Sequence, residues 1–147
     1  MKRISIVFAI LANSFLLDAQ NVGINNTNPG AALDVNGDLI LRNSNITLAN
    51  GANENINTTA AKFSHYTITG PTTVFEIGGL TGGVDGRILT LYNSSAFLMI
   101  IKHLSAGSVA ANQLHTGTGV DFTLSSYSSA SFRYSTLDNL WHITSTH

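Results

Sequence analysis

The sequence predicts an all-β protein with a short extended stem that contains a β-hairpin, followed by a head built as a β-sandwich or jelly roll. Composition is the first reason: Asn, Ser and Thr make up nearly a third of the chain, charged residues are only 10%, and there are 13 Gly. The second is that, from Phe63 onward, short alternating apolar runs recur between turn residues. A hydrophobic share of 44% and a net charge of −1 argue against a disordered chain.

Residues 1–20 have the pattern of a secretory signal peptide. Lys2 and Arg3 form a basic start, residues 4–17 are mostly apolar, and the small Ala19 precedes the expected cleavage point. The apolar stretch is shorter than the roughly 20 residues that span a membrane. We therefore expect a secreted or cell-surface protein that begins at Gln20 or Asn21 and does not insert into the membrane.

The predicted stem covers residues 21–62. Leu33 and Val35 alternate before Asn36-Gly37, and Leu39 and Leu41 alternate after it. Because Asn-Gly favours a two-residue type I′ turn, this spacing predicts a β-hairpin.

The rest of the stem, residues 43–62, is a polar low-complexity run that buries too little apolar surface to fold alone. It is either a flexible linker or a segment that pairs with copies of itself around one apolar axis. The alternation of Ile46 and Leu48 favours the second alternative.

The predicted head covers residues 63–147. Its one continuous apolar run, residues 96–103, has the length of a fully buried central strand. The last segment reads as a hairpin, with Phe132 and Tyr134 on one arm and Trp141 and Ile143 on the other.

The segment "VGINNTNPGAALDVNGDLILR" resembles the "VGIGTTNPxxxLDVNG" segment of phage tail-fibre proteins and of many exported bacterial surface proteins. The second half is similar to the small β-rich tip domains that follow that segment, through "GGVDGRILTLYN", "AANQL" and the spacing of Tyr134 and Trp141. The chain departs from the pattern at Asn25-Asn26, where Gly-Thr is usual. The resemblance implies a homotrimeric, fibre-like stalk that carries a β-structured head.

No residue pattern predicts a catalytic, cofactor or metal site. Asp34, Asn36 and Asp38 have the spacing of a calcium loop, but Leu39 and Asn45 stand where such a loop needs Gly and Glu, so we read the three as a solvated strand face. The five His show no metal-binding spacing, and Cys is absent. Without a basic stripe, nucleic acid is not an expected partner.

Aromatic side chains give the candidate ligand-binding residues Tyr127, Tyr92 and Trp141, which could stack on sugar rings. For Trp141 we favour a core position over a ligand contact, because buried aromatics dominate small β cores. We expect a secreted, non-enzymatic, adhesin-like fibre protein that forms a homotrimer and binds surface glycans through head loops. The alternatives are a monomeric carbohydrate-binding module with a flexible leader and an exported polysaccharide-degrading enzyme.

N-terminal sequencing of the exported protein tests the signal peptide. We expect the first residue to be Gln20 or Asn21, because signal peptidase cuts after a small residue such as Ala19. Recovery of Met1 on the exported chain would show that the segment is retained.

Overall fold

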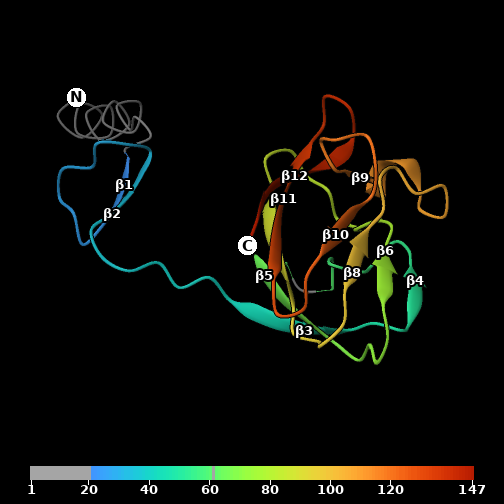
Figure 1. Cartoon of the computed structure of the whole chain (residues 1–147). Coiled ribbons are helices and arrows are strands. Elements are labelled where there is room, and N and C mark those ends of the chain that lie inside the picture. The colour runs from blue at the N-terminus through green and yellow to red at the C-terminus, as the bar shows by residue number, and fades with distance from the viewer. Residues whose placement is uncertain (1–20, 61) are drawn as a thin grey trace, which may run out of the picture. The chain divides into compact units, whose positions relative to one another are not determined.

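The computed structural model describes residues 21–60 and 62–147 (Figure 1). The predicted signal peptide, residues 1–20, lies outside the described residues. The chain divides into two compact units, with the boundary between Ile40 and Leu41. The sequence analysis placed the boundary between stem and head after residue 62. In the structure, residues 43–60 belong to the larger unit, where residues 43–47 and 51–53 pair with later strands.

In the smaller unit, β1 (Val22–Ile24) and β2 (Leu33–Val35) pair in parallel. The Asp34 carboxylate accepts hydrogen bonds from the Asn26 side chain at 2.9 Å and from the Gly30 N–H at 2.9 Å. These bonds hold the loop that returns the chain from β1 to β2.

The predicted hairpin across Asn36-Gly37 is wrong. Residues 38–42 form no strand, and the partner of β2 is the upstream strand β1. A type I′ turn needs positive φ at both central residues, and here only Gly37 has it, at 155°. The Asn36 N–H instead donates to the Ile24 carbonyl at 3.0 Å, which continues the parallel pairing.

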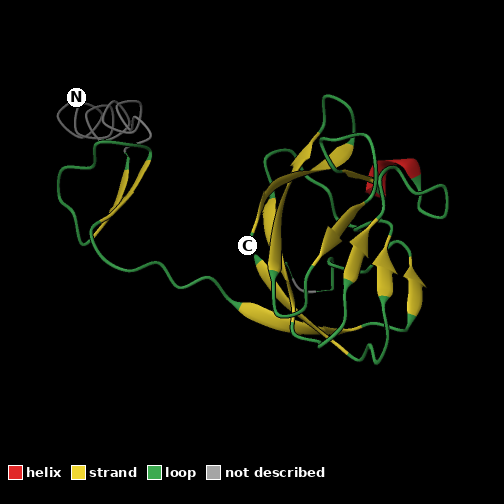
Figure 2. Cartoon of the chain, viewed as in Figure 1, coloured by secondary structure: helices red, strands yellow, loops and turns green. Residues whose placement is uncertain are grey.

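In the larger unit, successive turns of the chain each contribute one strand to each of two sheets (Figures 1 and 2). The strands that alternate between the sheets are β3 (Asn43–Thr47), β4 (Gly51–Asn53), β5 (His65–Thr69), β6 (Phe75–Ile77), β7 (Ile88–Asn93) and β8 (Met99–Ile101). β3, β5 and β7 pair in parallel, and so do β4, β6 and β8. This is a β-solenoid-like arrangement, whereas a sandwich or jelly roll would join its strands mainly in antiparallel fashion.

The predicted all-β class is confirmed. Among the described residues the only helical segment is a short 3₁₀ turn, η2 (Ala110–Asn112), drawn red in Figure 2. The apolar run at 96–103 contributes only β8, in which Met99 and Ile101 are buried. Phe97 and Leu98 are 37% and 44% exposed, so the run is not buried throughout as predicted.

Four later strands complete the sheets: β9 (Leu114–His115), β10 (Phe122–Leu124), β11 (Ser129–Ser135) and β12 (Leu140–Thr146). β10 pairs antiparallel with β8, and the β11–β12 hairpin adds to β7. β9 then pairs in parallel with β12. The resulting orders are β10-β8-β6-β4 in the four-stranded sheet and β3-β5-β7-β11-β12-β9 in the six-stranded sheet.

The closing hairpin was correctly predicted from the alternation of its residues. Phe132 lies opposite Ile143, and Tyr134 lies opposite Trp141. The indole N–H of the fully buried Trp141 donates to the Leu80 carbonyl at 2.8 Å. Because this ring fills the core between the sheets, its loss would cost about 3–5 kcal/mol.

Asparagine side chains explain how the polar segment 43–60 folds without a large apolar core. The Asn53 amide donates to the carbonyls of Ala49 at 3.0 Å and Glu76 at 3.1 Å. The Asn50 side-chain oxygen accepts from the Thr72 N–H at 2.8 Å on the next turn of the chain. These amides satisfy backbone groups at the corners, where apolar packing is sparse.

Gly51 and Gly70 both have positive φ, but only Gly70 is packed closely against a neighbouring segment. Substitution of each by alanine therefore distinguishes the cost of backbone strain from the cost of a steric clash. A Cβ on Gly70 (φ 104°) would lie 2.5 Å from the Leu48 carbonyl oxygen, whereas one on Gly51 (φ 74°) would meet nothing within 4 Å. We expect Gly51→Ala to lower the free energy of unfolding by about 1–2 kcal/mol. Gly70→Ala should cost a further roughly 1–3 kcal/mol from overpacking. Equal losses in urea unfolding of both variants would contradict the close approach of these two turns.

Candidate functional site

Two neighbouring clefts open at one end of the six-stranded sheet. The larger has a volume of about 640 Å³ and the smaller one of about 330 Å³. Asp85, in the loop before β7, contributes to both. The larger cleft is lined by Leu41, Lys62, Phe63, Ser64, Val84, Asp85, Gly86, Arg87, Ile88 and Thr90.

The walls of the larger cleft come from segments that parallel pairing brings together. Leu41 precedes β3, Ser64 precedes β5, and Ile88 begins β7. Leu41 and Ile88 are each 59% exposed, so the cleft presents apolar side chains to solvent. Apolar walls with a few polar groups at the rim are typical of a binding cleft.

Arg87 stabilises the floor of this cleft. Its guanidinium donates to the Gly82 carbonyl at 2.7 Å and to the Thr58 carbonyl at 2.9 Å, and it lies 5.7 Å from the Trp141 ring centroid. These contacts fix its position between two turns of the chain. Arg87 therefore shapes the cleft through the backbone groups that it holds.

Asp85 carries a negative charge between the two clefts. Its carboxylate accepts the Thr136 N–H at 3.0 Å. This hydrogen bond, with a smaller contribution from Arg133, holds the pKa of Asp85 below its usual range. A general acid for glycoside hydrolysis needs a raised pKa, and Asp85 has the opposite property.

The smaller cleft lies over the β11–β12 hairpin and is more polar. Its walls include Arg133 and Tyr134 on β11 and His142 on β12, with Asp85 at the boundary. Arg133 is exposed, and none of the described contacts gives its guanidinium a hydrogen-bond partner. A cation in this state is available to an anionic group of a ligand.

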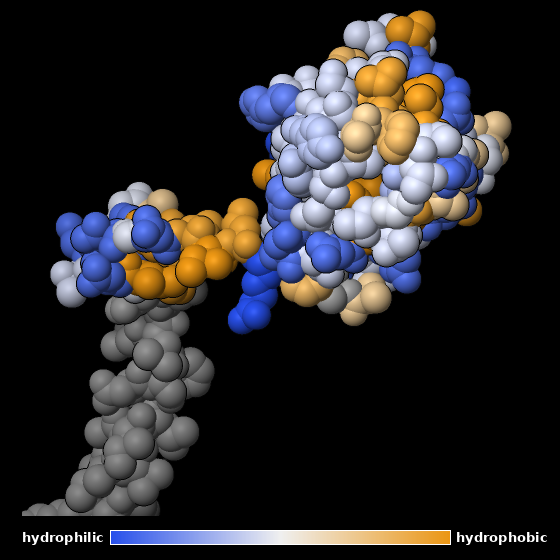
Figure 3. Space-filling model, turned by 60° about the horizontal axis from the view of Figure 1, so that its bottom comes forward, coloured by the Kyte–Doolittle hydropathy of each residue, from blue (hydrophilic) through white to orange (hydrophobic). Residues whose placement is uncertain are grey.

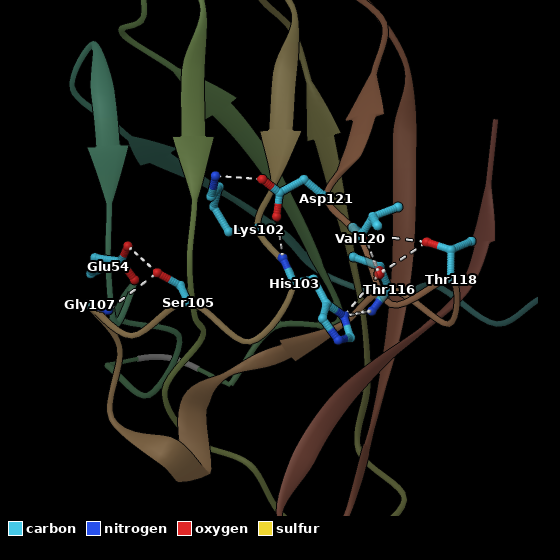
Figure 4. A network of polar contacts seen from close by, with 9 residues as sticks. All are labelled: Glu54, Lys102, His103, Ser105, Gly107, Thr116, Thr118, Val120 and Asp121. Carbon is cyan, nitrogen blue, oxygen red and sulfur yellow. Dashed lines mark hydrogen bonds and ion pairs between the residues drawn. The ribbon is translucent and has the colours of Figure 1, made fainter.

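A separate polar network ties the loops after β8 to the first turn of the larger unit (Figure 4). The Glu54 carboxylate accepts hydrogen bonds from the hydroxyls of Ser105, at 2.7 Å, and Ser108. Gly78 and Gly107 pack so closely against this carboxylate that a Cβ on either would overlap it. Glu54 therefore acts as an internal brace for the loop.

The same network holds an ion pair between Lys102 and Asp121 (Figure 4). The Lys102 ammonium and the His103 N–H, which donates at 2.8 Å, lower the pKa of Asp121. Asp121 in turn raises the pKa of Lys102. Both groups are therefore charged at neutral pH, and they fix the chain where it leaves β8 and enters β10.

The three aromatic residues proposed as ligand-binding from the sequence occupy different environments. Tyr127 is 63% exposed in the loop before β11, and Tyr92 is half-buried on the outer face of β7. These two come from neighbouring segments, because Ser129 pairs with Tyr92. Trp141 is fully buried and faces no solvent, so it belongs to the core. None of the three lines the two clefts.

The structure brings His103, His115 and His142 together, although their spacing in the sequence did not predict a cluster. The ring centroids of His103 and His115 are 4.9 Å apart, and those of His115 and His142 are 5.1 Å apart. Strand pairing places His115 beside His142, and the loop after β8 supplies His103. Within residues 21–60 and 62–147, no group of three or more His, Cys, Asp or Glu has a geometry that could hold a metal ion.

No protein-family model matches the chain, and no curated protein matches it. Over the part of the chain that the structure describes, no helix has the length and apolar character needed to cross a membrane.

Replacing Glu54 tests its role as a brace. Glu54→Ala removes the acceptor for the hydroxyls of Ser105 and Ser108, and Ser108 is buried, so we expect a loss of about 1–3 kcal/mol in the free energy of unfolding. Glu76→Ala is the control, because this half-buried glutamate on β6 makes no side-chain hydrogen bond in the described contacts. Its cost should stay within about 0.5 kcal/mol. Similar losses for both variants in urea unfolding would exclude the brace.

Proposed function

We propose that this protein is an exported, non-enzymatic, adhesin-like fibre protein that assembles as a homotrimer and presents a glycan-binding head. In this proposal the residues before the head associate between copies, and the larger unit is the head. The resemblance of residues 22–42 to tail-fibre and surface-protein segments motivates it, and the all-β architecture is compatible with it.

The observation that carries the proposal is a concentration of exposed aliphatic side chains before the head. Figure 3 shows apolar surface gathered over one side of the smaller unit. The exposed fractions reach 70% for Leu39 and 88% for Ile40. The large aliphatic residues exposed in the smaller unit are Val22, Ile24, Leu33, Leu39 and Ile40.

Burial of these side chains against other copies removes apolar surface from water. A contiguous exposed apolar region of this kind is unusual in a monomeric protein and typical of an interface. In an oligomer with closed cyclic symmetry, every copy buries the same apolar surface against its neighbours. This supports a small symmetric oligomer such as a trimer. Three heads would then bind a repetitive surface with avidity.

The clefts support a binding role for the head. The larger one offers apolar walls, which suit the apolar face of a sugar ring, beside the exposed amine of Lys62 and the carboxylate of Asp85. The carboxyl groups of Asp85, Asp121 and Asp138 all have lowered pKa values. Groups of this kind bind and orient a ligand rather than donate a proton to it.

Sedimentation velocity of the purified chain at micromolar concentration tests the assembly. We expect a species of three times the chain mass, and we expect the triple variant Leu33→Ser, Leu39→Ser, Ile40→Ser to sediment as a monomer, because it removes the most exposed aliphatic side chains of the segment.

A matched triple variant on the larger unit is the control. Val109, Val120 and Leu137 are 62%, 64% and 95% exposed, so serine at these positions removes comparable apolar surface elsewhere. This variant should keep the mass of the wild type. A monomeric wild type would contradict the proposal and favour a monomeric carbohydrate-binding module.

A further inference from the structure

A row of uncharged polar side chains crosses the outer face of the six-stranded sheet, whose strands β3, β5 and β11 are labelled in Figure 1. Strand pairing places Tyr92 on β7 between Thr67 on β5 and Ser129 on β11. Asn45 on β3 lies beside Thr67 on its other side. Alternation with buried residues turns these side chains away from the core. We call Asn45, Thr67, Tyr92 and Ser129 the polar row.

The polar row lies on a part of the sheet that has no fixed charge. The outward-facing residues of β3, β5 and β7 include neither a carboxylate nor a Lys or Arg, and His65 is the one imidazole among them. On β11 the first charged side chain is Arg133, four residues beyond Ser129. An ionic ligand on this face would lose hydration without gaining an ion pair, so the face favours an uncharged ligand.

Most polar groups of the row are available to a ligand. The side chains of Asn45, Tyr92 and Ser129 make no hydrogen bond in the described contacts. The Thr67 hydroxyl accepts a hydrogen bond from the Asn43 amide at 3.2 Å. One amide and two hydroxyls therefore remain to bond groups that both donate and accept, as the hydroxyls of a sugar do.

Tyr127 stands next to this row in a strained turn, two residues before Ser129 on the chain. Its φ is 56°, a left-handed conformation that costs free energy in a bulky residue, and it is 63% exposed. Packing does not account for this conformation, because most of the residue faces solvent. Backbone strain that the surrounding structure holds in place is typical of functional sites.

The buried residue Asn93 holds the turn of Tyr127 in place. Its side-chain amide donates to the Ser125 carbonyl at 3.1 Å, and its backbone N–H donates to the Ser128 carbonyl at 2.9 Å. Asn93 follows Tyr92 directly on β7, so these bonds join the turn to the strand end that carries Tyr92. Two tyrosines on a preformed support lose little conformational freedom when a ligand binds, which favours affinity.

We propose that the polar row and Tyr127 bind an uncharged, β-linked polysaccharide of the glucan type that lies flat across the strands. The inference rests on the proposed glycan-binding function of the head, and it names the class of glycan and a surface separate from the two clefts. The hydroxyl groups of such a sugar are equatorial, so each ring presents an apolar face to a tyrosine and hydroxyls at its edge to Asn45 and Ser129.

The spacing of the strands favours a polymer over a single sugar. Neighbouring strands lie about 4.8 Å apart, which is close to the length of one sugar unit. A chain that crosses the strands therefore meets successive members of the polar row with successive sugars.

Affinity electrophoresis of the purified chain in gels that contain hydroxyethylcellulose or carboxymethylcellulose tests the class of glycan. The two polymers share a β-linked glucan backbone, and only the second carries carboxylates. We expect the dissociation constant for hydroxyethylcellulose to be at least about tenfold lower, because no cation of the polar row offsets the charge of the other polymer.

Substitution of the tyrosines connects binding to this surface. Tyr127→Asn removes the ring and supplies a residue that tolerates positive φ, and Tyr92→Thr supplies a β-branched residue that suits a strand. We expect each to weaken binding to hydroxyethylcellulose about tenfold, since the apolar contact of one stacked ring is lost. Tyr127→Phe keeps the ring and should bind within about twofold of the wild type.

Two variants outside this surface are the controls. Leu137→Asn removes a 95% exposed apolar residue from the turn between β11 and β12, and Lys62→Gln changes the lining of the larger cleft. Both should bind hydroxyethylcellulose like the wild type. Thermal unfolding checks that each variant is folded.

The outcomes separate this proposal from the proposed function. Unchanged binding by both tyrosine variants would overturn this proposal, and a loss of binding in Lys62→Gln would then place the glycan in the larger cleft with the proposed function intact. Equal or tighter binding of carboxymethylcellulose would overturn the selection of an uncharged glycan. Absence of binding to either polymer would overturn this proposal as well, while the sedimentation experiment decides the assembly independently.

Discussion

Parallel pairing between successive turns of the chain sets the position of the clefts on the larger unit. His65 pairs with Thr90, and the antiparallel strand β11 continues that sheet from β7. Because side chains alternate between the faces of a strand, one register determines which residues reach the core and which reach solvent. The register is held from inside by Trp141, whose indole bonds the Leu80 carbonyl across the core. A change that shifted the strand register of one turn by one residue would turn core side chains toward solvent and solvent-facing side chains toward the core.

Alternation within a strand was enough to predict the class of fold and the closing hairpin from the sequence. Phe132 and Trp141 lie on strands whose apolar residues recur at every second position, and tertiary packing keeps that pattern. The solenoid-like order was not predictable in the same way. Gly51 and Asn53 on β4 stand in register with Phe75 and Ile77 on β6, so the apolar pattern of one turn is not repeated there in the other. The Asn53 side chain instead satisfies backbone groups.

The turn-forming residues Asn36-Gly37 led to a wrong prediction, because the segment before them pairs with an upstream strand. Asn36-Gly37 has the composition of a tight hairpin turn, but the Asn36 N–H is already bonded to the Ile24 carbonyl. The clefts and the histidine cluster could not be predicted from the sequence for a related reason. Arg133, His142 and His115 become neighbours only through strand pairing, and His103 joins them through a loop held by the ion pair of Asp121. The spacing of these residues in the sequence does not predict that they lie close together.

The hydrogen bond between Trp141 and Leu80 has a consequence for the order of folding. It joins residues 61 positions apart, and β11 likewise pairs with β7 across a long separation. Such distant contacts slow folding, because the entropy of loop closure is lost before the contacts form. The early turns therefore gain little stability until β11 and β12 have been synthesised and have docked. A nascent chain of this kind therefore stays loosely packed through most of its synthesis.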